Sequence, residues 1–168
     1  MKWFVVAWLF TAGIGMSYSI AAERNKKIHQ LVDMEQSLKR LAYYMFQWHL
    51  PVKEAIAFTA KEENEILRVF YNELQESLEQ RKSEDFSLLW RENGARWFEN
   101  VPEEIRILWM ESFENIPLES ETLYRRLSER AQKMKEFTQE LQQKYKGEQK
   151  IVFTMGVFVS AFLCLILW

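Results

Sequence analysis

Hydrophobic residues recur at helical spacing through the middle of this chain. From Ile28 to Trp48 they follow the alternating intervals of three and four residues that mark one face of a helix. This pattern stops before Pro51, because a proline ring disfavours helical geometry in the residue that precedes it. Shorter patterns of the same kind predict further helices over about 52–59, 66–78, 86–92 and 103–113.

The helix ends carry their own signals. Ser83 and Asp85 are candidate N-caps for the helix that includes Trp90, and Asn93-Gly94 is its predicted stop. The last pattern begins near Glu119 or Ser120 and keeps an apolar stripe as far as Tyr145. It can continue through Gly147 into the uncharged end of the chain, which would produce one long helix.

The fold class follows from what the pattern lacks. Strict alternation of apolar and polar residues does not persist over six positions anywhere in the middle of the chain, so no sheet is expected. We therefore predict an all-α protein whose middle is an antiparallel bundle of about six helices.

Charge divides the chain into three regions. Apart from Lys2, every Lys, Arg, Asp and Glu lies between Glu23 and Lys150. About 20 helical residues cross a bilayer core of about 30 Å, so both uncharged ends are long enough to span it. The predicted regions are a transmembrane helix over 1–22, a helical bundle domain over 23–150 and a transmembrane helix over 151–168. The N-terminal block could alternatively be a cleaved signal peptide, with Ser19-Ile20-Ala21 as its cleavage site.

Basic residues set the expected orientation of the two spans. Positive charge next to a span holds that side in the cytosol, so a two-pass protein of the cell membrane with a cytosolic middle domain is expected. The residues that carry this prediction are Arg24, Lys26, Lys27, Lys144, Lys146 and Lys150.

Small residues inside the two predicted spans suggest helix packing. Gly15 and Ser19 are four residues apart, as are Gly156 and Ser160, and this spacing lets another helix approach closely. The partner helix could be the other span of the same chain or a span of another subunit, so a homo-oligomer fits the pattern. The same spacing also arises often by chance.

The sequence offers little catalytic chemistry. With 22 basic and 24 acidic residues it lacks the positive field that nucleic-acid binding requires. His29 and His49 have no ligand partners at metal-binding spacing, the single Cys164 cannot form an intrachain disulfide, and the five glycines form no phosphate loop. We therefore expect no enzyme activity, no cofactor and no metal.

Aromatic residues are the feature of the middle domain that most needs explaining. Large side chains of this type are enriched at interface hot spots, so four of them are a candidate partner interface. Burial in the core is the favoured interpretation of these rings, and Trp97-Phe98, next to the predicted loop at 100–102, is the best candidate for an exposed contact. The four residues are Trp97, Phe98, Trp109 and Phe113.

Two stretches resemble a known family. They are LVDMEQSLKRLAYYMFQWHLPVKEAIAFTA, at 31–60, and YKGEQKIVFTMGVFVSAFLCLILW, at 145–168. The first has a leucine-rich helix followed by Leu50-Pro51-Val52, and the second places Gly156 early in the final span. With their bracketing layout, these stretches are similar to those of the stage III sporulation protein AB family.

The resemblance implies a function that composition does not. It implies a non-catalytic subunit of a sporulation-specific channel in the mother-cell membrane, with a cytosolic domain similar to those of type II secretion platform proteins. It also implies two kinds of partner, a cytosolic secretion-type ATPase resembling stage III sporulation protein AA and other stage III sporulation membrane proteins. The alternative is a membrane-anchored regulatory or signalling protein unrelated to secretion.

Overall fold

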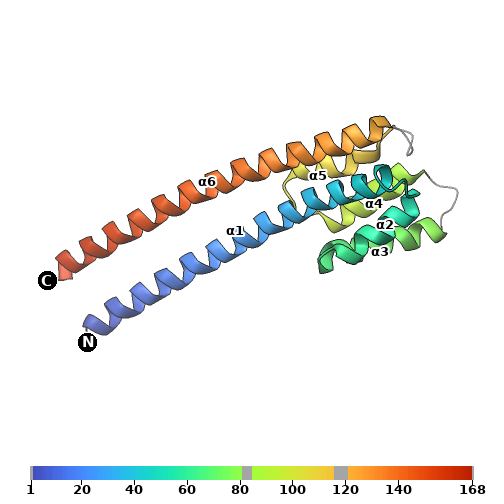
Figure 1. Cartoon of the computed structure of the whole chain (residues 1–168). Helices are drawn as coiled ribbons and strands as arrows, with labels where there is room; N and C mark the ends of the chain where they lie inside the picture. The colour runs from blue at the N-terminus through green and yellow to red at the C-terminus, as the bar shows by residue number, and fades with distance from the viewer. Residues whose placement is uncertain (1, 81–84, 116–120, 168) are drawn as a thin grey trace. The chain divides into compact units, whose positions relative to one another are not determined.

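The computed structural model describes residues 2–80, 85–115 and 121–167, except for the side chains of 2–20, 152–153, 156–157 and 159–167. Over these ranges the chain forms six α-helices and one 3-10 turn, with no strand (Figure 1). The prediction of an all-α protein is therefore confirmed. The elements are α1 (Lys2–Phe46), α2 (Val52–Glu62), α3 (Glu65–Gln80), α4 (Phe86–Trp97), α5 (Glu103–Met110), η1 (Glu111–Phe113) and α6 (Glu121–Leu167).

The chain divides into two compact units. Unit 1 combines Met1–His29 with Gln139–Trp168, and unit 2 is Gln30–Thr138. Helices α1 and α6 contribute residues to both units, because neither helix ends at the boundary. The prediction that the last helix continues through Gly147 into the uncharged end is confirmed, since α6 extends without interruption over 47 residues.

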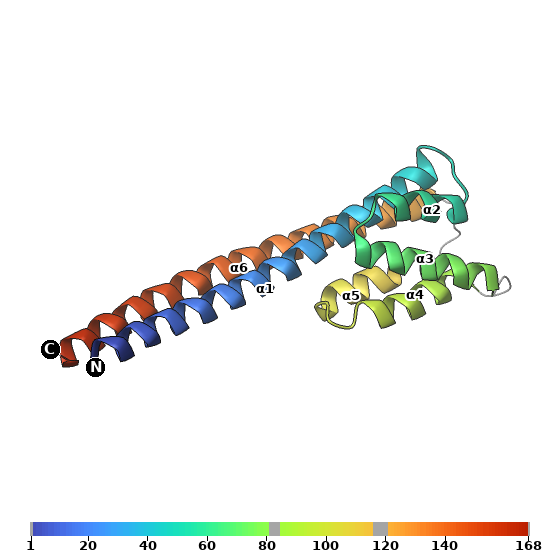
Figure 2. The ribbon, with the colours of Figure 1, turned by 90° about the horizontal axis from the view of Figure 1, so that it is seen from below.

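Unit 1 consists of two helical segments. The N-terminal part of α1 and the C-terminal part of α6 run antiparallel and side by side, with the two uncharged blocks at the same end (Figures 1 and 2). A search of the described residues finds no helix long and apolar enough to cross a membrane. The structure does not describe the surroundings of most residues in the spans predicted over 1–22 and 151–168, and Gly15, Ser19, Gly156 and Ser160 are among them.

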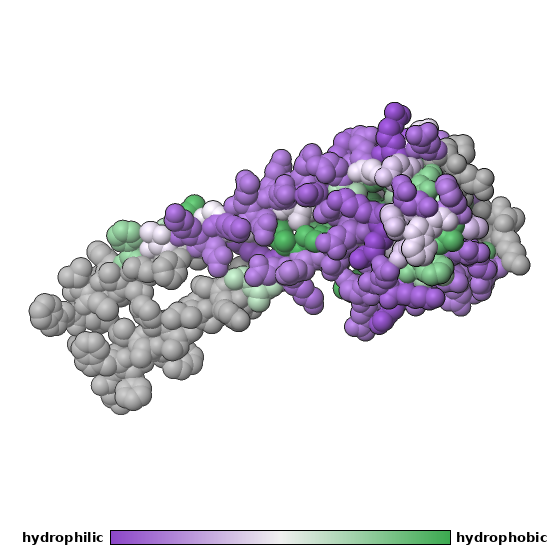
Figure 3. Space-filling model, viewed as in Figure 1, coloured by the Kyte–Doolittle hydropathy of each residue, from purple (hydrophilic) through white to green (hydrophobic). Residues whose placement is uncertain are grey.

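The core of unit 2 begins with the apolar faces of its longest helices. On α1, residues from Leu31 to Leu41 that recur every three or four positions are almost completely buried, and a similar face runs from Leu123 to Met134 on α6. The ring of Phe46 contacts that of Tyr124 at a centroid distance of 5.2 Å, which joins the two helices. In the coloured part of Figure 3 hydrophilic residues predominate, and hydrophobic residues appear in small areas between them.

Aromatic rings fill the rest of this core. Trp90 on α4 stacks on Trp109 of α5 with ring centroids 5.0 Å apart and an interplanar angle of 24°. The Trp90 indole N–H donates a hydrogen bond to the carbonyl oxygen of Trp109 at 2.7 Å. Phe70 of α3 contacts both indoles edge-on, at centroid distances of 5.3 and 5.6 Å. Consecutive helices pack against one another here, α2 on α3, α3 on α4 and α4 on α5, and the last three helices carry these rings.

The structure corrects one predicted helix end. Helix α4 does not stop at Asn93-Gly94 but continues to Trp97. Gly94 serves interhelix packing, because a Cβ at this position would lie 3.1 Å from Cδ1 of Trp109. At the other end the predicted N-cap Asp85 is confirmed, since its carboxylate accepts a hydrogen bond from the backbone N–H of Ser87 at 3.0 Å. Ser83 lies outside the described residues.

Candidate functional site

The turn between α1 and α2 brings four aromatic rings together. His49 adopts a left-handed conformation, with φ at 51°, and the backbone N–H of Leu50 donates to the carbonyl oxygen of Tyr44 at 3.2 Å. Such a geometry commonly ends a helix, and Pro51 is the N-cap residue that immediately precedes α2. The turn places aromatic residues from α1, from the turn itself and from α2 next to one another. We call this set the corner cluster: Tyr43, Tyr44, Trp48 and Phe58.

The rings of the corner cluster contact one another directly. Trp48 lies at its centre, with ring centroids 5.2 Å from Tyr44, 6.2 Å from Tyr43 and 6.2 Å from Phe58. The Trp48 indole N–H donates a hydrogen bond to the Tyr43 hydroxyl at 3.3 Å. Edge-to-face and tilted arrangements of this kind are favourable, by about 0.5–1.5 kcal/mol per pair beyond the area that they bury.

Much of the corner cluster is exposed to solvent. The exposed fraction is 53% for Trp48, 49% for Tyr43 and 39% for Phe58, whereas Tyr44 is buried beneath them. The Lys61 ammonium lies 5.0 Å from the centroid of the Phe58 ring, so the cluster already accepts a cation from its own chain. The cluster is therefore an aromatic surface with both apolar and cation-binding capacity.

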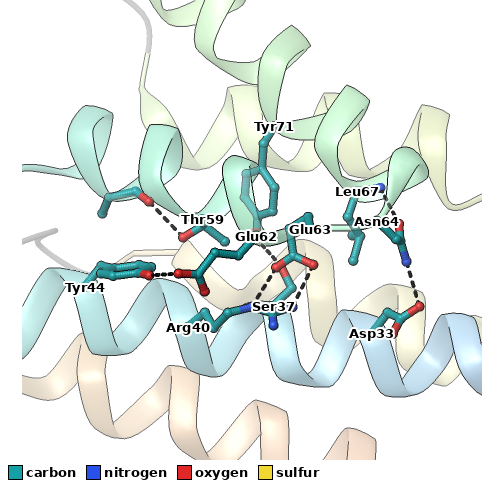
Figure 4. Close-up of polar contacts among 11 residues, drawn as sticks. Asp33, Ser37, Arg40, Tyr44, Thr59, Glu62, Glu63, Asn64, Leu67 and Tyr71 are labelled. Atoms are coloured by element: carbon teal, nitrogen blue, oxygen red, sulfur yellow. Dashed lines mark hydrogen bonds and ion pairs between the residues drawn. The ribbon is translucent and has the colours of Figure 1, made fainter.

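Polar contacts hold the corner cluster against α2 (Figure 4). The Tyr44 hydroxyl donates a hydrogen bond to Oε1 of Glu62 at 2.5 Å. This bond to a carboxylate stabilises the protonated phenol and raises the pKa of Tyr44 to about 12. Tyr44 is thus fixed at both its ring and its hydroxyl, and it supports the exposed rings above it.

A buried ion pair lies next to this contact. Two nitrogens of the Arg40 guanidinium donate to the two carboxylate oxygens of Glu63, at 3.1 and 2.8 Å. The Glu63 side chain is only 1% exposed. Its burial raises the pKa of its carboxyl group above the ordinary value, and the Arg40 charge and the Ser37 hydroxyl oppose that rise. This pair joins α1 to the residue that follows α2.

Further hydrogen bonds connect α1 with the start of α3. Ser37 and Tyr71 share a buried hydroxyl–hydroxyl bond of 2.6 Å. The Asn64 amide donates to Asp33 at 2.6 Å, and its oxygen accepts from the backbone N–H of Leu67 at 3.1 Å. Figure 4 shows these contacts in a row along one side of α1. They fix the α2–α3 pair on α1, and with it the position of the corner cluster.

The candidate partner interface of the sequence analysis lies mostly in the core. Phe98 and Trp109 have no exposed surface and Phe113 is 1% exposed, so core burial, the interpretation that the sequence analysis favours, is confirmed for all three. They are inaccessible to a partner because α3, α4 and α5 close around them. Trp97 keeps partial exposure, and its indole N–H donates to Glu73 at 2.8 Å.

Sequence reasoning missed the corner cluster, although the sequence contains a signal for it. Residues 43–48 include four aromatic side chains in six positions, and a single helix face cannot bury all of them. Some of these rings must therefore point away from the core, immediately before the turn at Pro51.

The basic residues next to the uncharged blocks fall into two groups. Arg24 forms an ion pair with Glu148 at 3.0 Å, and its guanidinium carbon lies 4.8 Å from the centroid of the Tyr145 ring. Lys27 pairs with Glu23 at 3.5 Å. The other four, Lys26, Lys144, Lys146 and Lys150, are exposed. Arg24 therefore joins α1 to α6 within unit 1.

No grouping of three or more His, Cys, Asp or Glu side chains in the described part of the chain could hold a metal ion. The corner cluster offers aromatic faces and a supporting acid, which suit the binding of a protein surface.

Comparison with known proteins places the chain in a family. Neither the curated proteins nor the solved structures include a match. The family model described as "Stage III sporulation protein AB (spore_III_AB)" matches residues 2–168, which is the chain from its second residue to its last. The chain therefore belongs to the stage III sporulation protein AB family, as the resemblance of residues 31–60 and 145–168 predicts.

Proposed function

We propose that this protein is a two-pass membrane platform subunit that couples a cytosolic secretion-type ATPase to other stage III sporulation membrane proteins. The observation that carries the proposal is the continuity of α1 and α6, each of which extends from an uncharged block into unit 2. Membership of a stage III sporulation family supports a role in sporulation. In this role the protein has no catalytic step of its own.

The membrane placement is supported by the distribution of charge. Both uncharged blocks are helical, and they lie at the same end of unit 1. Basic residues follow the first block and precede the second, so both spans favour a cytosolic position for the segment between them. This segment would lie on the mother-cell side of the membrane.

The corner cluster is the proposed contact for the ATPase. Trp48 and Tyr43 expose about half of their surface, and Trp and Tyr are the residues that most often anchor interfaces. Lys61 already lies over one ring of the cluster, so the surface suits a partner segment that presents Arg or Lys to the other rings. The buried network beneath the cluster pre-organises it, which lowers the ordering cost of binding.

Helix α6 is the proposed route of coupling. Its buried face from Leu123 to Met134 belongs to the core of unit 2, and the same helix continues through Gly147 to the second uncharged block. A displacement of the core can thus reach the membrane without crossing a loop.

Capture of the ATPase from sporulating cells tests the proposed contact. The full-length protein would be compared with a Trp48→Ala, Phe58→Ala double variant. The matched control is a Leu88→Ala, Ile107→Ala double variant, because these are also large apolar residues exposed on unit 2, at 37% and 39%. Loss of a hot spot of about 2 kcal/mol weakens binding about 30-fold, so the first variant should recover little ATPase.

The outcomes separate the two functions considered for this chain. Equal recovery of the ATPase by the corner variant and the control would exclude the corner cluster as the contact. Failure of the unaltered protein to recover any ATPase or stage III protein would refute the platform role and leave the membrane-anchored regulatory function. Reporter fusions that place 23–150 outside the cytosol would refute the topology.

A further inference from the structure

Positive charge is concentrated where the two helices of unit 1 meet their uncharged blocks. Segments 23–27 and 144–150 together contain six basic and two acidic residues, a net charge of +4. The whole chain has a net charge of −2, so the rest of it carries −6. The basic residues are therefore concentrated in these two segments, where each helix meets its uncharged block, and the rest of the chain is acidic.

The acidic residues of these segments are already engaged. Glu148 pairs with Arg24 at 3.0 Å, and Glu23 pairs with Lys27 at 3.5 Å. Four exposed lysines remain, and none of them forms an ion pair with any residue that the structure describes. We call these four the lysine collar: Lys26, Lys144, Lys146 and Lys150.

The lysine collar includes residues from both helices at one level. The Arg24–Glu148 ion pair places 23–27 beside 144–150, and the Arg24–Tyr145 contact supports the same register. Beyond this level, away from unit 2 along the sequence, each helix continues with uncharged residues only, apart from Lys2. Unpaired ammonium groups thus lie at the border between a charged and an uncharged helical segment.

We propose that the lysine collar binds the anionic headgroups of phospholipids such as phosphatidylglycerol. This inference rests on the membrane placement proposed above. A lysine at a bilayer border extends its aliphatic stem along the apolar boundary and leaves its ammonium group at headgroup depth. There it meets lipid phosphates, and anionic lipids attract each such cation. An acidic protein or a nucleic acid is a poorer occupant, because the collar adjoins an uncharged helical surface on one side.

Spin-labelled lipids can test the collar in the full-length protein. The protein would be reconstituted in phosphatidylcholine nanodiscs that contain a trace of spin-labelled phosphatidylglycerol or spin-labelled phosphatidylcholine. The spectrum separates lipid that is restricted by contact with the protein from free lipid. We expect the restricted fraction to favour phosphatidylglycerol by at least about fivefold, the factor for one lysine near an anionic surface. This preference should decline at about 1 M salt, where the Debye length falls to about 3 Å and charges are strongly screened.

Matched variants identify the residues responsible. The collar variant is Lys26→Gln, Lys144→Gln, Lys146→Gln, Lys150→Gln. It should show no preference for phosphatidylglycerol over phosphatidylcholine, a ratio of about 1. The control carries the same change at four lysines of unit 2 and should keep the full preference. Its substitutions are Lys53→Gln, Lys61→Gln, Lys133→Gln and Lys135→Gln.

Each remaining outcome has a separate meaning. Retained preference in the collar variant, or equal loss in the control, would overturn the collar as the binding site. The preference for phosphatidylglycerol would also be compared in phosphate and chloride buffers of equal ionic strength. Its loss in phosphate alone would mean that the collar binds free phosphate instead of lipid. Absence of any restricted lipid of either kind would refute the membrane placement itself, and so the proposed function.

Discussion

Replacing Arg40 with methionine should strongly destabilise unit 2. Methionine keeps most of the aliphatic length of the arginine but removes the guanidinium that neutralises Glu63. The two hydrogen bonds to Glu63, at 2.8 and 3.1 Å, would be lost, and its carboxylate would stay in a site where its side chain is only 1% exposed.

The expected cost follows from the burial of each partner. Breaking a buried ion pair by removing one partner costs about 3–5 kcal/mol, because the remaining charge has no compensation. We expect about 3 kcal/mol, the lower end, because the Arg40 side chain is itself 30% exposed and water can enter where it was. Replacing both residues with methionine should recover most of the loss, since no buried charge then remains.

The measurement is denaturant unfolding of the full-length protein in mild detergent, followed by tryptophan fluorescence and circular dichroism. The control is Lys53→Met, which breaks the Lys53–Glu79 pair at 2.9 Å. Both side chains of that pair are more than half exposed, so its loss should cost about 0–1 kcal/mol. Equal effects of the two single substitutions would refute the view that burial makes the Arg40–Glu63 pair important.

The pH dependence of the Arg40 variant gives a second test. Burial raises the pKa of Glu63 in the folded protein, so the folded state binds more protons than the unfolded state between the two pKa values. The contribution of Glu63 to stability therefore decreases as pH rises through that interval, which begins near the ordinary value of 4.5. The positive charge of Arg40 lowers the pKa of Glu63, so removing Arg40 should raise this pKa further and extend the interval to higher pH. The cost of Arg40→Met should then be smaller at mildly acidic pH than at neutral pH, and a cost that grows on acidification would contradict this argument.

Three further predictions concern particular contacts. Gly94→Ala should lower the free energy of unfolding by about 1–3 kcal/mol, because its Cβ would lie 3.1 Å from Cδ1 of Trp109, a ring that is fully buried among other aromatic rings and cannot move aside. Gly147→Ala should instead stabilise α6 by about 0.5–1 kcal/mol, because no atom lies within 4 Å of that Cβ; the same unfolding experiment measures both. Tyr44→Phe should remove the hydrogen bond to Glu62. In a pH titration followed by ultraviolet absorbance, the variant should lack the one tyrosine whose pKa is about 12. That bond stabilises the folded protein fully below the ordinary pKa of 10, and its contribution is lost as pH rises through about 12.

The sequence predicts the helices well because their signals are local. Apolar residues at intervals of three and four require only neighbours along one helix, and Pro51 and Asp85 mark ends that form within a few residues. Gly94 shows where local reasoning fails. Glycine often ends a helix, but here it provides space for the indole of Trp109, fifteen positions further along the chain. This requirement comes from the packing of α4 on α5, which no local pattern contains.

The contacts that support the corner cluster were also beyond sequence reasoning. Arg40 and Glu63 are 23 positions apart, and Ser37 and Tyr71 are 34 apart. Their pairing depends on the register of α2 and α3 against α1. Charge patterning identified the six basic residues next to the uncharged blocks, because this signal is local. It did not predict that Arg24 would pair with Glu148, which requires α1 and α6 to lie side by side.

The exposure of an aromatic residue depends on its position relative to the end of its helix. Trp90 lies four residues after Phe86 on the face of α4 that packs inward, and it is completely buried. Trp48 lies two residues after Phe46, the last residue of α1. It is in a turn, where no helix face carries it into the core, and 53% of its surface is exposed. A search for aromatic residues alone therefore identified Trp109 and Phe113, whose rings are buried. The position of Trp48 just beyond the end of α1 is the property that distinguishes a candidate contact residue from a core residue.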